Sequence, residues 1–406
     1  MIGVIADDVT GATDVAAAIR RAGLRTMLAL SPDIDGGAID ADAVVVGLKT
    51  RSIDRDDAVA QSLAALEVLQ GLGATRFYFK YCSTFDSTPQ GNIGPVTEAL
   101  AARLGSEIVI STPAAPLHGR TVSQGDLLVN GIPLQETHMR EHPITPMRDS
   151  SVPRLLGPQV TGRVASVPVQ TIRAGDLVDE IAASVRAGVD HLIADAIEEA
   201  DLDAIAAAVH DAPLTAGSAG LIGAIARRGA PSDPDLPALP TGSTAIIAGS
   251  CSQRTLEQID CFRAAGGSAF ALVAEPGTTP EDLAAATLDW WDERREGESG
   301  LVYSSRPAEQ RDPRVPDAGT LYEKAAGLIA LGLADRGVRR LLIAGGETSG
   351  EVVKALGTRI ATVGREAAAG VPWIHDQDRD LHLALKSGNF GGQELFVDVA
   401  LESGTR

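Results

Sequence analysis

The sequence predicts an α/β fold that consists of two α/β domains with mainly parallel sheets and an interdomain active-site cleft. Short apolar runs alternate with longer amphipathic segments from residue 2 onward, which is typical of β-α-β units. The alternation stops at residues 230–240, which hold four prolines, and then resumes. Because proline resists helices and central strands, we place a linker at 230–242 between an N-terminal domain, 1–229, and a C-terminal domain, 243–406.

The elements of the first half follow from the lengths of these runs. The predicted strands are residues 2–6, 26–30, 43–48, 76–81 and 107–111, and the predicted helices are residues 15–22, 56–72 and 95–104. Residues 113–165 interrupt the pattern with many prolines and polar side chains. We therefore predict long loops or an insertion there, in a place where it could line a site.

The second half repeats the same alternation. The predicted strands are residues 244–248, 270–274, 301–304, 340–344 and 381–385, and the predicted helices are residues 254–265 and 280–295. In parallel sheets of this kind, the loops at the carboxyl ends of the strands form the ligand crevice. The loops that follow these strands are therefore the segments in which we look for chemistry.

The composition restricts the class of partner. The chain has 54 acidic and 35 basic residues, a net charge of −19, which repels nucleic acid. Its three cysteines have no paired spacing, so we expect buried reduced thiols. The chain opens with a strand-like run, lacks a basic leader and has no apolar run of about 18 residues, so we predict a soluble cytoplasmic protein.

The first predicted strand leads directly into an acidic loop with the sequence Asp7-Asp8-Val9-Thr10-Gly11-Ala12-Thr13-Asp14. Two adjacent carboxylates at the end of a strand can act as a base, a metal ligand or an acceptor for a hydroxyl. Alternatively, Asp8 or Thr10 only caps the helix that follows. Both roles could coexist on different residues.

Three glycine-rich turns follow strands of the second half: Ala248-Gly249-Ser250-Cys251-Ser252, Ala344-Gly345-Gly346-Glu347-Thr348-Ser349-Gly350 and Lys386-Ser387-Gly388-Asn389-Phe390-Gly391-Gly392. Backbone N–H groups at such turns bind phosphate oxygens. None of the turns has the P-loop or the dinucleotide fingerprint, which disfavours a standard NTPase and a Rossmann dehydrogenase. The turns instead indicate a nucleotide site made of backbone amides and small hydroxyls.

Basic residues lie near the ends of predicted strands in the first half, namely Lys49, Arg51, Lys80 and Arg120. An arginine fork matches a carboxylate with two hydrogen bonds, so these residues are candidates for an anionic substrate, with surface solvation as the alternative. His138 and His142 have the spacing of metal ligands on a helix. They lack the H-E-x-x-H order and Pro143 follows, so we expect no zinc there.

Taken together, these motifs resemble the four-carbon acid sugar kinase family over essentially the whole chain. The segments that carry the resemblance are residues 6–14, 80–88, 345–350 and 385–391. The longer lysine segment, which ends in Pro89-Gln90-Gly91-Asn92, is similar to the 3-oxo-tetronate kinase branch rather than to the threonate and erythronate kinases. Gln90 stands where the other branch has arginine, so no arginine contact is carried over.

The resemblance implies an N-terminal acid-sugar domain, a C-terminal nucleotide domain, and transfer of the ATP γ-phosphoryl group to the C4 hydroxyl of a 3-oxo-tetronate, with Mg²⁺. Asp8 is implied as the catalytic base, supported by Asp7. The implied substrate-binding residues are Thr10, Gly11, Arg51, Lys80, Ser83, Thr84, Asp86 and Arg120. The implied ATP-binding residues are Ser250, Ser252, Ala344, Gly345, Gly346, Glu347, Thr348, Gly388 and Asn389.

The implied partners are a small-molecule acid sugar and ATP, with no nucleic acid and no membrane, and the sequence leaves a homodimer open. Two alternatives also stay open: a D-threonate or D-erythronate 4-kinase, and a non-catalytic two-domain protein that binds a small anion. The stereochemistry of the substrate and the identity of any metal ligands are not specified by the sequence.

Overall fold

The computed structural model describes residues 1–31, 39–141, 145–232, 239–305, 314–315 and 317–401. The chain divides into two compact units between residues 234 and 235, which we call the N-terminal and C-terminal units. Residues 233–238 of the predicted linker lie outside the described residues. The cleft between the domains stays a prediction.

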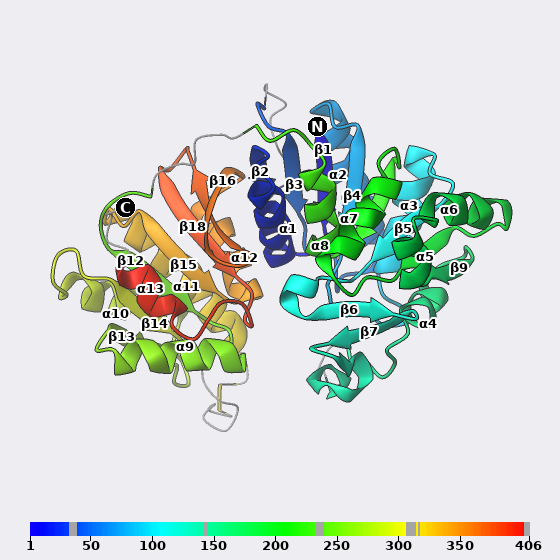
Figure 1. Ribbon diagram of the computed structural model, residues 1–406. Helices are drawn as coiled ribbons and strands as arrows, with labels where there is room; N and C mark the ends of the chain where they lie inside the picture. The colour runs from blue at the N-terminus through cyan, green and yellow to red at the C-terminus, as the bar shows by residue number, and fades with distance from the viewer. Residues whose placement is uncertain (32–38, 142–144, 233–238, 306–313, 316, 402–406) are drawn as a thin grey trace. The chain divides into compact units, whose positions relative to one another are not determined.

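The N-terminal unit is built on parallel strands, as predicted (Figure 1). Their order across the sheet is β2 (Thr26–Ala29), β3 (Ala43–Gly47), β1 (Ile2–Ala6), β4 (Arg76–Lys80), β11 (Leu214–Gly217), β5 (Val109–Thr112), β10 (His191–Ala194) and β9 (Val164–Val167). All five residues of β1 and of β3 are buried, which explains their continuous apolar sequences. These central strands form the core of the unit.

Helices flank this sheet in two packed groups (Figure 1). One group contains α1 (Val9–Arg21), α5 (Val169–Ala174), α6 (Leu177–Arg186), α7 (Glu199–Ala208) and α8 (Ala219–Arg227), and the other contains α2 (Arg55–Gly71) and α3 (Ile93–Leu104). The connections β1-α1-β2 and β3-α2-β4 run in opposite directions along the sheet. Right-handed crossovers therefore place α1 and α2 on opposite faces.

Helix α1 begins at Val9, six residues before the predicted start at residue 15. The prediction was wrong because the first turn contains Thr10 and Gly11, which are weak helix formers. The Asp8 side chain accepts a hydrogen bond from the Gly11 backbone N–H and so starts the helix early.

Residues 113–165 are more regular than the loops that we predicted. They contain a three-stranded antiparallel sheet of β6 (Arg120–Ser123), β7 (Asp126–Val129) and β8 (Ile132–Pro133), followed by the short helix α4 (Val152–Leu156). Val122, Leu127 and Leu134 are buried. The overlooked signal is Asn130-Gly131 between β7 and β8, where both residues have positive φ, as a tight hairpin requires.

The C-terminal unit has a mixed sheet (Figure 1). Its order is β13 (Ser268–Ala271), β14 (Gly300–Tyr303), β12 (Thr244–Ala248), β15 (Arg340–Ala344), β18 (Leu381–Lys386), β17 (Val371–Asp376) and β16 (Ile360–Ala368). The first five strands are parallel, whereas β17 runs antiparallel to both of its neighbours, β18 and β16. The predicted strands of this half are confirmed within a few residues, and β16 and β17 were not predicted.

Helices α10 (Pro280–Asp292), α11 (Ala318–Asp335) and α12 (Gly346–Leu356) pack together, and α9 (Gln253–Ala264) packs with α13 (Leu395–Leu401). The core below α9 and α13 includes Phe262, Trp373 and Phe396. Among the helices of the described ranges, none combines the length and apolar character that crossing a membrane requires.

Candidate active site

The carboxyl edge of the N-terminal sheet gathers the acidic loop and its predicted neighbours. Ala6 at the end of β1 pairs with Gly47 of β3 and with Lys80 of β4, so the segments that follow these three strands begin side by side. Backbone bonds then join them, because the Asp7 N–H donates to the Lys80 carbonyl and the Arg51 N–H donates to the Asp7 carbonyl. The prediction that these loops meet at one edge is confirmed.

Arg51 holds both carboxylates of the acidic loop. Its Nε and Nη2 atoms donate to the two oxygens of Asp7 at 2.9 and 2.8 Å, and Nη2 lies 2.8 Å from Asp8 Oδ1. These contacts involve Nε and Nη2, so the two N–H groups of Nη1 are the ones that could serve a substrate carboxylate. Arg51 organises the acidic loop, and its contact with substrate stays a prediction.

The two carboxyl groups differ in their protonation chemistry. Burial raises the pKa of Asp7, although Arg51 opposes that shift. Burial also acts on Asp8, but the charges of Arg51 and Lys80, with hydrogen bonds from Thr10 and Gly11, outweigh it and lower its pKa. The Asp8 side chain is 26% exposed and that of Asp7 is 5% exposed. Asp8 is thus the carboxyl group that ionises more readily and is more accessible.

Asp8 has one of the roles that the sequence left open, because it caps α1; its role as a base stays a prediction. Its Oδ1 accepts from the Gly11 N–H and its Oδ2 accepts from the Thr10 hydroxyl, each at 2.9 Å. A Cβ atom on Gly11 would lie 2.1 Å from Asp8 Oδ1 and 2.9 Å from the Lys80 ammonium. Only glycine leaves room for this packing.

The segment after β4 brings three polar side chains together. Asp86 accepts from the Thr84 hydroxyl at 2.5 Å and from the Cys82 thiol at 3.0 Å. Phe85 between them is buried and has φ of 52°, a strained backbone for a bulky residue, and this turn lets Thr84 and Asp86 face Cys82. Burial raises the pKa of Cys82 to about 11, so it stays a thiol that donates to Asp86.

A small cavity adjoins this cluster and is lined in part by Asp7, Arg51, Asp86 and Asn92. The Asn92 amide donates to the carbonyls of Thr50 and Ile53 and so fixes the loop that carries Arg51. Ser83 is half-buried in the same segment.

Arg120 does not join this group through any hydrogen bond or ion pair of the described residues. It lies at the start of β6, where its guanidinium donates to the His118 carbonyl and its Nε atom is buried without a partner. Sequence reasoning placed it beside the other cations because it follows a strand. The antiparallel sheet of residues 120–133 carries it instead.

The three glycine turns of the C-terminal unit converge as predicted. Ala248 of β12 pairs with Ala344 of β15, which pairs with Lys386 of β18, so the turns leave three adjacent parallel strands at one edge. The N–H groups of Gly249 and Ser250 donate to the Ala344 carbonyl, and the Gly345 N–H donates to the Lys386 carbonyl.

Close packing explains why glycine occupies these turns. A Cβ atom on Gly388 would lie 2.4 Å from Ser250 Oγ and 2.8 Å from Ser252 Oγ, and one on Gly249 would lie 2.1 Å from Thr348 Oγ1. Gly345 also has φ of 132°, which favours glycine. The side chains of Ser250, Ser252 and Thr348 are therefore held against the neighbouring turns.

Lys386 is a residue of this edge that sequence reasoning quoted but did not select. Its buried ammonium donates to the hydroxyl of Thr255 at 3.1 Å and to the carbonyls of Ser387 and Gly388 at 3.0 and 2.8 Å. Burial, together with the charge of Arg254, lowers its pKa to about 7. The available signal was a lysine that directly follows the apolar strand residues 381–385.

The edge fits a nucleotide phosphate. Gly346, Glu347 and Thr348 form the first turn of α12, where helical N–H groups have no acceptors within the helix and attract anions. Gly346, Glu347 and Asn389 are exposed, so their backbone is accessible. Use of Mg²⁺ stays a prediction; this ion commonly binds one or two carboxylates together with substrate phosphates.

Two other expectations concern residues elsewhere. His138 is exposed in a short 3-10 turn, and His142 lies outside the described residues. All three cysteines are free thiols, but Cys251 is exposed and Cys82 and Cys261 are only half-buried, so the predicted burial was wrong for Cys251 and incomplete for the other two.

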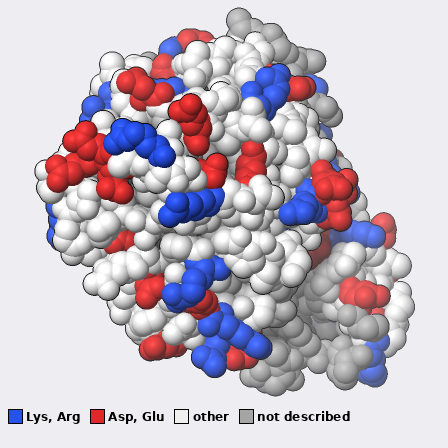
Figure 2. Space-filling model, turned by 90° about the vertical axis from the view of Figure 1, so that its right-hand side faces the viewer, with Lys and Arg blue, Asp and Glu red and all other residues white. Residues whose placement is uncertain are grey.

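Basic and acidic side chains are intermixed on the face shown in Figure 2, without a large basic patch on that face.

The fold and the two polar edges define an α/β protein with one unit suited to a polar organic substrate and another suited to a nucleotide. Two family patterns match in the same order. The pattern described as "Sugar-binding N-terminal domain" covers residues 2–225, and the one described as "Nucleotide-binding C-terminal domain" covers residues 245–396.

Similar proteins extend this match along the chain. A 3-oxo-tetronate kinase of Brucella melitensis biotype 1 is 40% identical, with 98% of this chain and 94% of the relative covered. A 3-oxo-tetronate kinase of Pseudomonas fluorescens is 42% identical, with 98% and 95% covered. The chain belongs to the four-carbon acid sugar kinase family, in the branch of the 3-oxo-tetronate kinases.

A solved structure agrees on the fold. The crystal structure of a Salmonella typhimurium LT2 protein matches with a TM-score of 0.91 and 36% identity over 99% of both chains. That structure bears the name "putative tRNA synthase", which differs from the kinase names of the sequence relatives. A net charge of −19 opposes a polyanionic partner and favours the kinase names.

Proposed function

We propose that the protein is an ATP-dependent kinase that phosphorylates the C4 hydroxyl of a 3-oxo-tetronate to give the 4-phosphate. The observation that carries the proposal is the near-full-length similarity to relatives named 3-oxo-tetronate kinase. It is supported by an acidic, lysine-containing edge in one unit and a glycine-rich edge in the other.

The C-terminal edge would hold the nucleotide. The N-terminal turn of α12 and the hydroxyls of Ser250, Ser252 and Thr348 supply donors for phosphate oxygens. Lys386 fixes the third turn through Thr255 and Gly388, so we assign it a positioning role. ATP, with Mg²⁺ bound to its phosphates, supplies the phosphoryl group and neutralises part of the negative charge.

The N-terminal edge would hold the acid sugar. Lys80 is buried beside Asp8, so its ammonium is the cation that we propose for the substrate carboxylate. Asp8 would accept the proton of the C4 hydroxyl while that oxygen forms the new bond to phosphorus and ADP leaves. Arg51 positions the two carboxylates, and the Thr84–Asp86 pair offers further contacts to sugar hydroxyls.

Phosphoryl transfer depends mainly on positioning and charge stabilisation, so both edges must be rigid before substrates bind. The numerous hydrogen bonds of Arg51 and Lys386 meet that requirement. A D-threonate or D-erythronate 4-kinase is the alternative enzyme, because it would use the same edges. The longer segment after Lys80 favours the oxidised acid.

A coupled assay of ADP release tests the proposal. Both enantiomers of 3-oxo-tetronate are compared with D-threonate and D-erythronate, and binding of ATP is compared with binding of NAD. We expect ADP release with one 3-oxo-tetronate enantiomer and weak or no release with the reduced acids. Higher kcat/KM with threonate or erythronate would favour the alternative kinase, and no release with any acid would favour a non-catalytic binding protein.

A further inference from the structure

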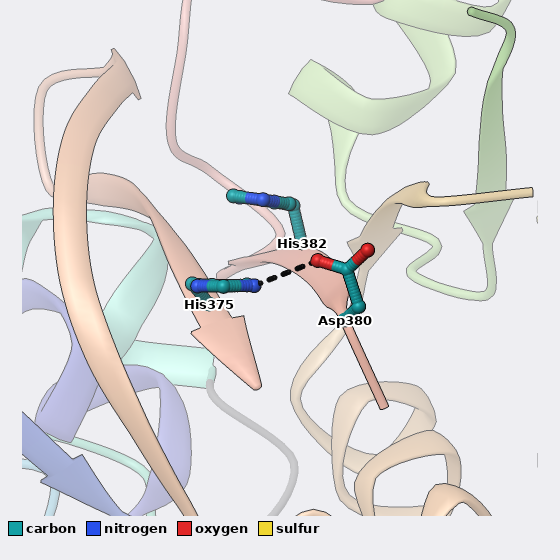
Figure 3. Close-up of side chains that lie close together, drawn as sticks. All are labelled: His375, Asp380 and His382. Atoms are coloured by element: carbon teal, nitrogen blue, oxygen red, sulfur yellow. Dashed lines mark hydrogen bonds and ion pairs between the residues drawn. The ribbon is translucent and has the colours of Figure 1, made fainter. Parts of the chain in front are cut away.

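A cluster of two histidines and one aspartate lies on the antiparallel hairpin of β17 and β18 (Figure 3). His375 and His382 are directly opposite each other in the register of the two strands. Their rings stack with centroids 4.3 Å apart and planes 9° apart. The pair is therefore set by the pleat of the sheet, which is a rigid framework for ligands.

Asp380 completes the cluster from the turn of the hairpin. One of its carboxylate oxygens lies 3.2 Å from His375 Nε2, and its φ is 49°. This left-handed backbone aims the side chain back over the strands, as Figure 3 shows. One ligand atom from each of the three residues lies within 4.8 Å of the others. No other group of three such residues is this compact among the described ranges.

The carboxylate of the neighbouring Asp376 is already occupied by hydrogen bonds to other groups. It accepts from the backbone N–H groups of Asp378 and Arg379 and from the Thr358 hydroxyl. Asp380, in contrast, has a side chain that is 80% exposed. His382 is buried, whereas the side chain of His375 is 20% exposed.

We propose that His375, Asp380 and His382 bind one divalent transition-metal ion of the zinc class. Two imidazoles and a carboxylate, with water in the remaining position, are a usual donor set for such ions. Donor atoms around tetrahedral zinc are about 3.3 Å apart, so the stacked rings rotate to bring one nitrogen of each to the ion.

This site is separate from the proposed ATP and Mg²⁺ site. His382 is near the start of β18 and Lys386 is at its end, about 13 Å away along the strand. Mg²⁺ prefers oxygen ligands, whereas two of the three donors here are nitrogen atoms. The ion would stabilise the hairpin of β17 and β18, which leads into the third glycine turn at residues 386–392. It takes no part in phosphoryl transfer.

The test uses the full-length, tag-free protein after treatment with EDTA, titrated with Co²⁺ by visible absorption and with Zn²⁺ by calorimetry. We expect one equivalent to bind to the wild type, and binding at least about tenfold weaker in His375→Ala and Asp380→Asn. Asparagine tolerates the left-handed backbone of residue 380, so the second variant keeps the fold. His210→Ala removes an exposed histidine of the N-terminal unit and should bind like the wild type.

A second readout is thermal unfolding, which Zn²⁺ should shift upward for the wild type and for His210→Ala but not for the two cluster variants. The proposal is overturned if the wild type binds no Co²⁺ or Zn²⁺, or if the cluster variants bind as tightly as His210→Ala.

Discussion

The two units of this protein differ in the charges that lie at the C-terminal ends of their parallel strands. The N-terminal edge concentrates full charges, because Asp7, Asp8, Arg51 and Lys80 lie together and compensate one another. The C-terminal edge places backbone amides and hydroxyls on glycine turns around one buried amine, Lys386. Proton transfer needs an ionised group in a fixed place, whereas binding of a polyanion needs many donors and little negative charge.

The largest effect that this comparison predicts comes from Asp8→Asn. Asparagine caps a helix about as well as aspartate, so α1 should still begin at Val9, whereas loss of the negative charge beside Arg51 and Lys80 should lower the free energy of unfolding. Loss of the base should lower kcat by about 10²- to 10⁴-fold, measured by ADP release at saturating substrate. Near-normal turnover would show that Asp8 is only a cap.

The next effect tests whether the charged edge depends on Arg51. Arg51→Met leaves the buried Asp7 carboxylate without its two hydrogen bonds, and we expect a loss of about 3 kcal/mol in the free energy of unfolding. Arg154→Met breaks the exposed pair with Asp149 and should cost less than about 1 kcal/mol. Equal urea midpoints for the two variants would contradict the role of Arg51.

The buried amine of the C-terminal edge predicts a pH dependence. The pKa of Lys386 is about 7 in the folded protein and 10.5 ordinarily, so between pH 7 and 9 the unfolded chain holds a proton that the folded chain has lost. Stability therefore rises with pH in this window. The free energy of unfolding of the wild type relative to Lys386→Met should rise by about 2 kcal/mol from pH 7 to 9. A constant difference would mean that the amine titrates normally.

The smallest effect separates nucleotide binding from acid binding. Gly388→Ala forces a Cβ atom against Ser250 and Ser252, whereas Gly392→Ala meets no atom within 4 Å. We expect KM for ATP to rise about tenfold in the first variant only, with KM for the acid unchanged in both. A rise in KM for the acid alone would assign the third turn to the other substrate.

The sequence predicted the parallel strands and the two polar edges because these depend on local signals. Residues 244–248 and 340–344 are mainly apolar runs of strand length, and a glycine follows each of them directly. The antiparallel strand β16 escaped prediction because Arg365 and Glu366 interrupt its apolar residues. The hairpin at Asn130 was overlooked although its signal is local.

Pairings between distant residues were beyond sequence reasoning. Arg51 lies 44 residues from Asp7, and Lys386 lies 131 residues from Thr255. Sequence reasoning placed Asp7 and Arg51 in neighbouring loops, but it predicted neither of these side-chain hydrogen bonds. The place of Arg120 in the site stays a prediction, because its hydrogen bond to the His118 carbonyl does not test it.

The most direct test of the account is to identify the phosphorylated product. Protein, ATP and 3-oxo-tetronate are incubated with Mg²⁺, and the product is analysed by phosphorus NMR, alongside a 4-deoxy analogue that lacks the acceptor hydroxyl. We predict one phosphate monoester at C4 for each ADP formed, and no product from the analogue. ADP formation without a C4 ester, or equal ADP formation with the analogue, would contradict the proposed kinase activity.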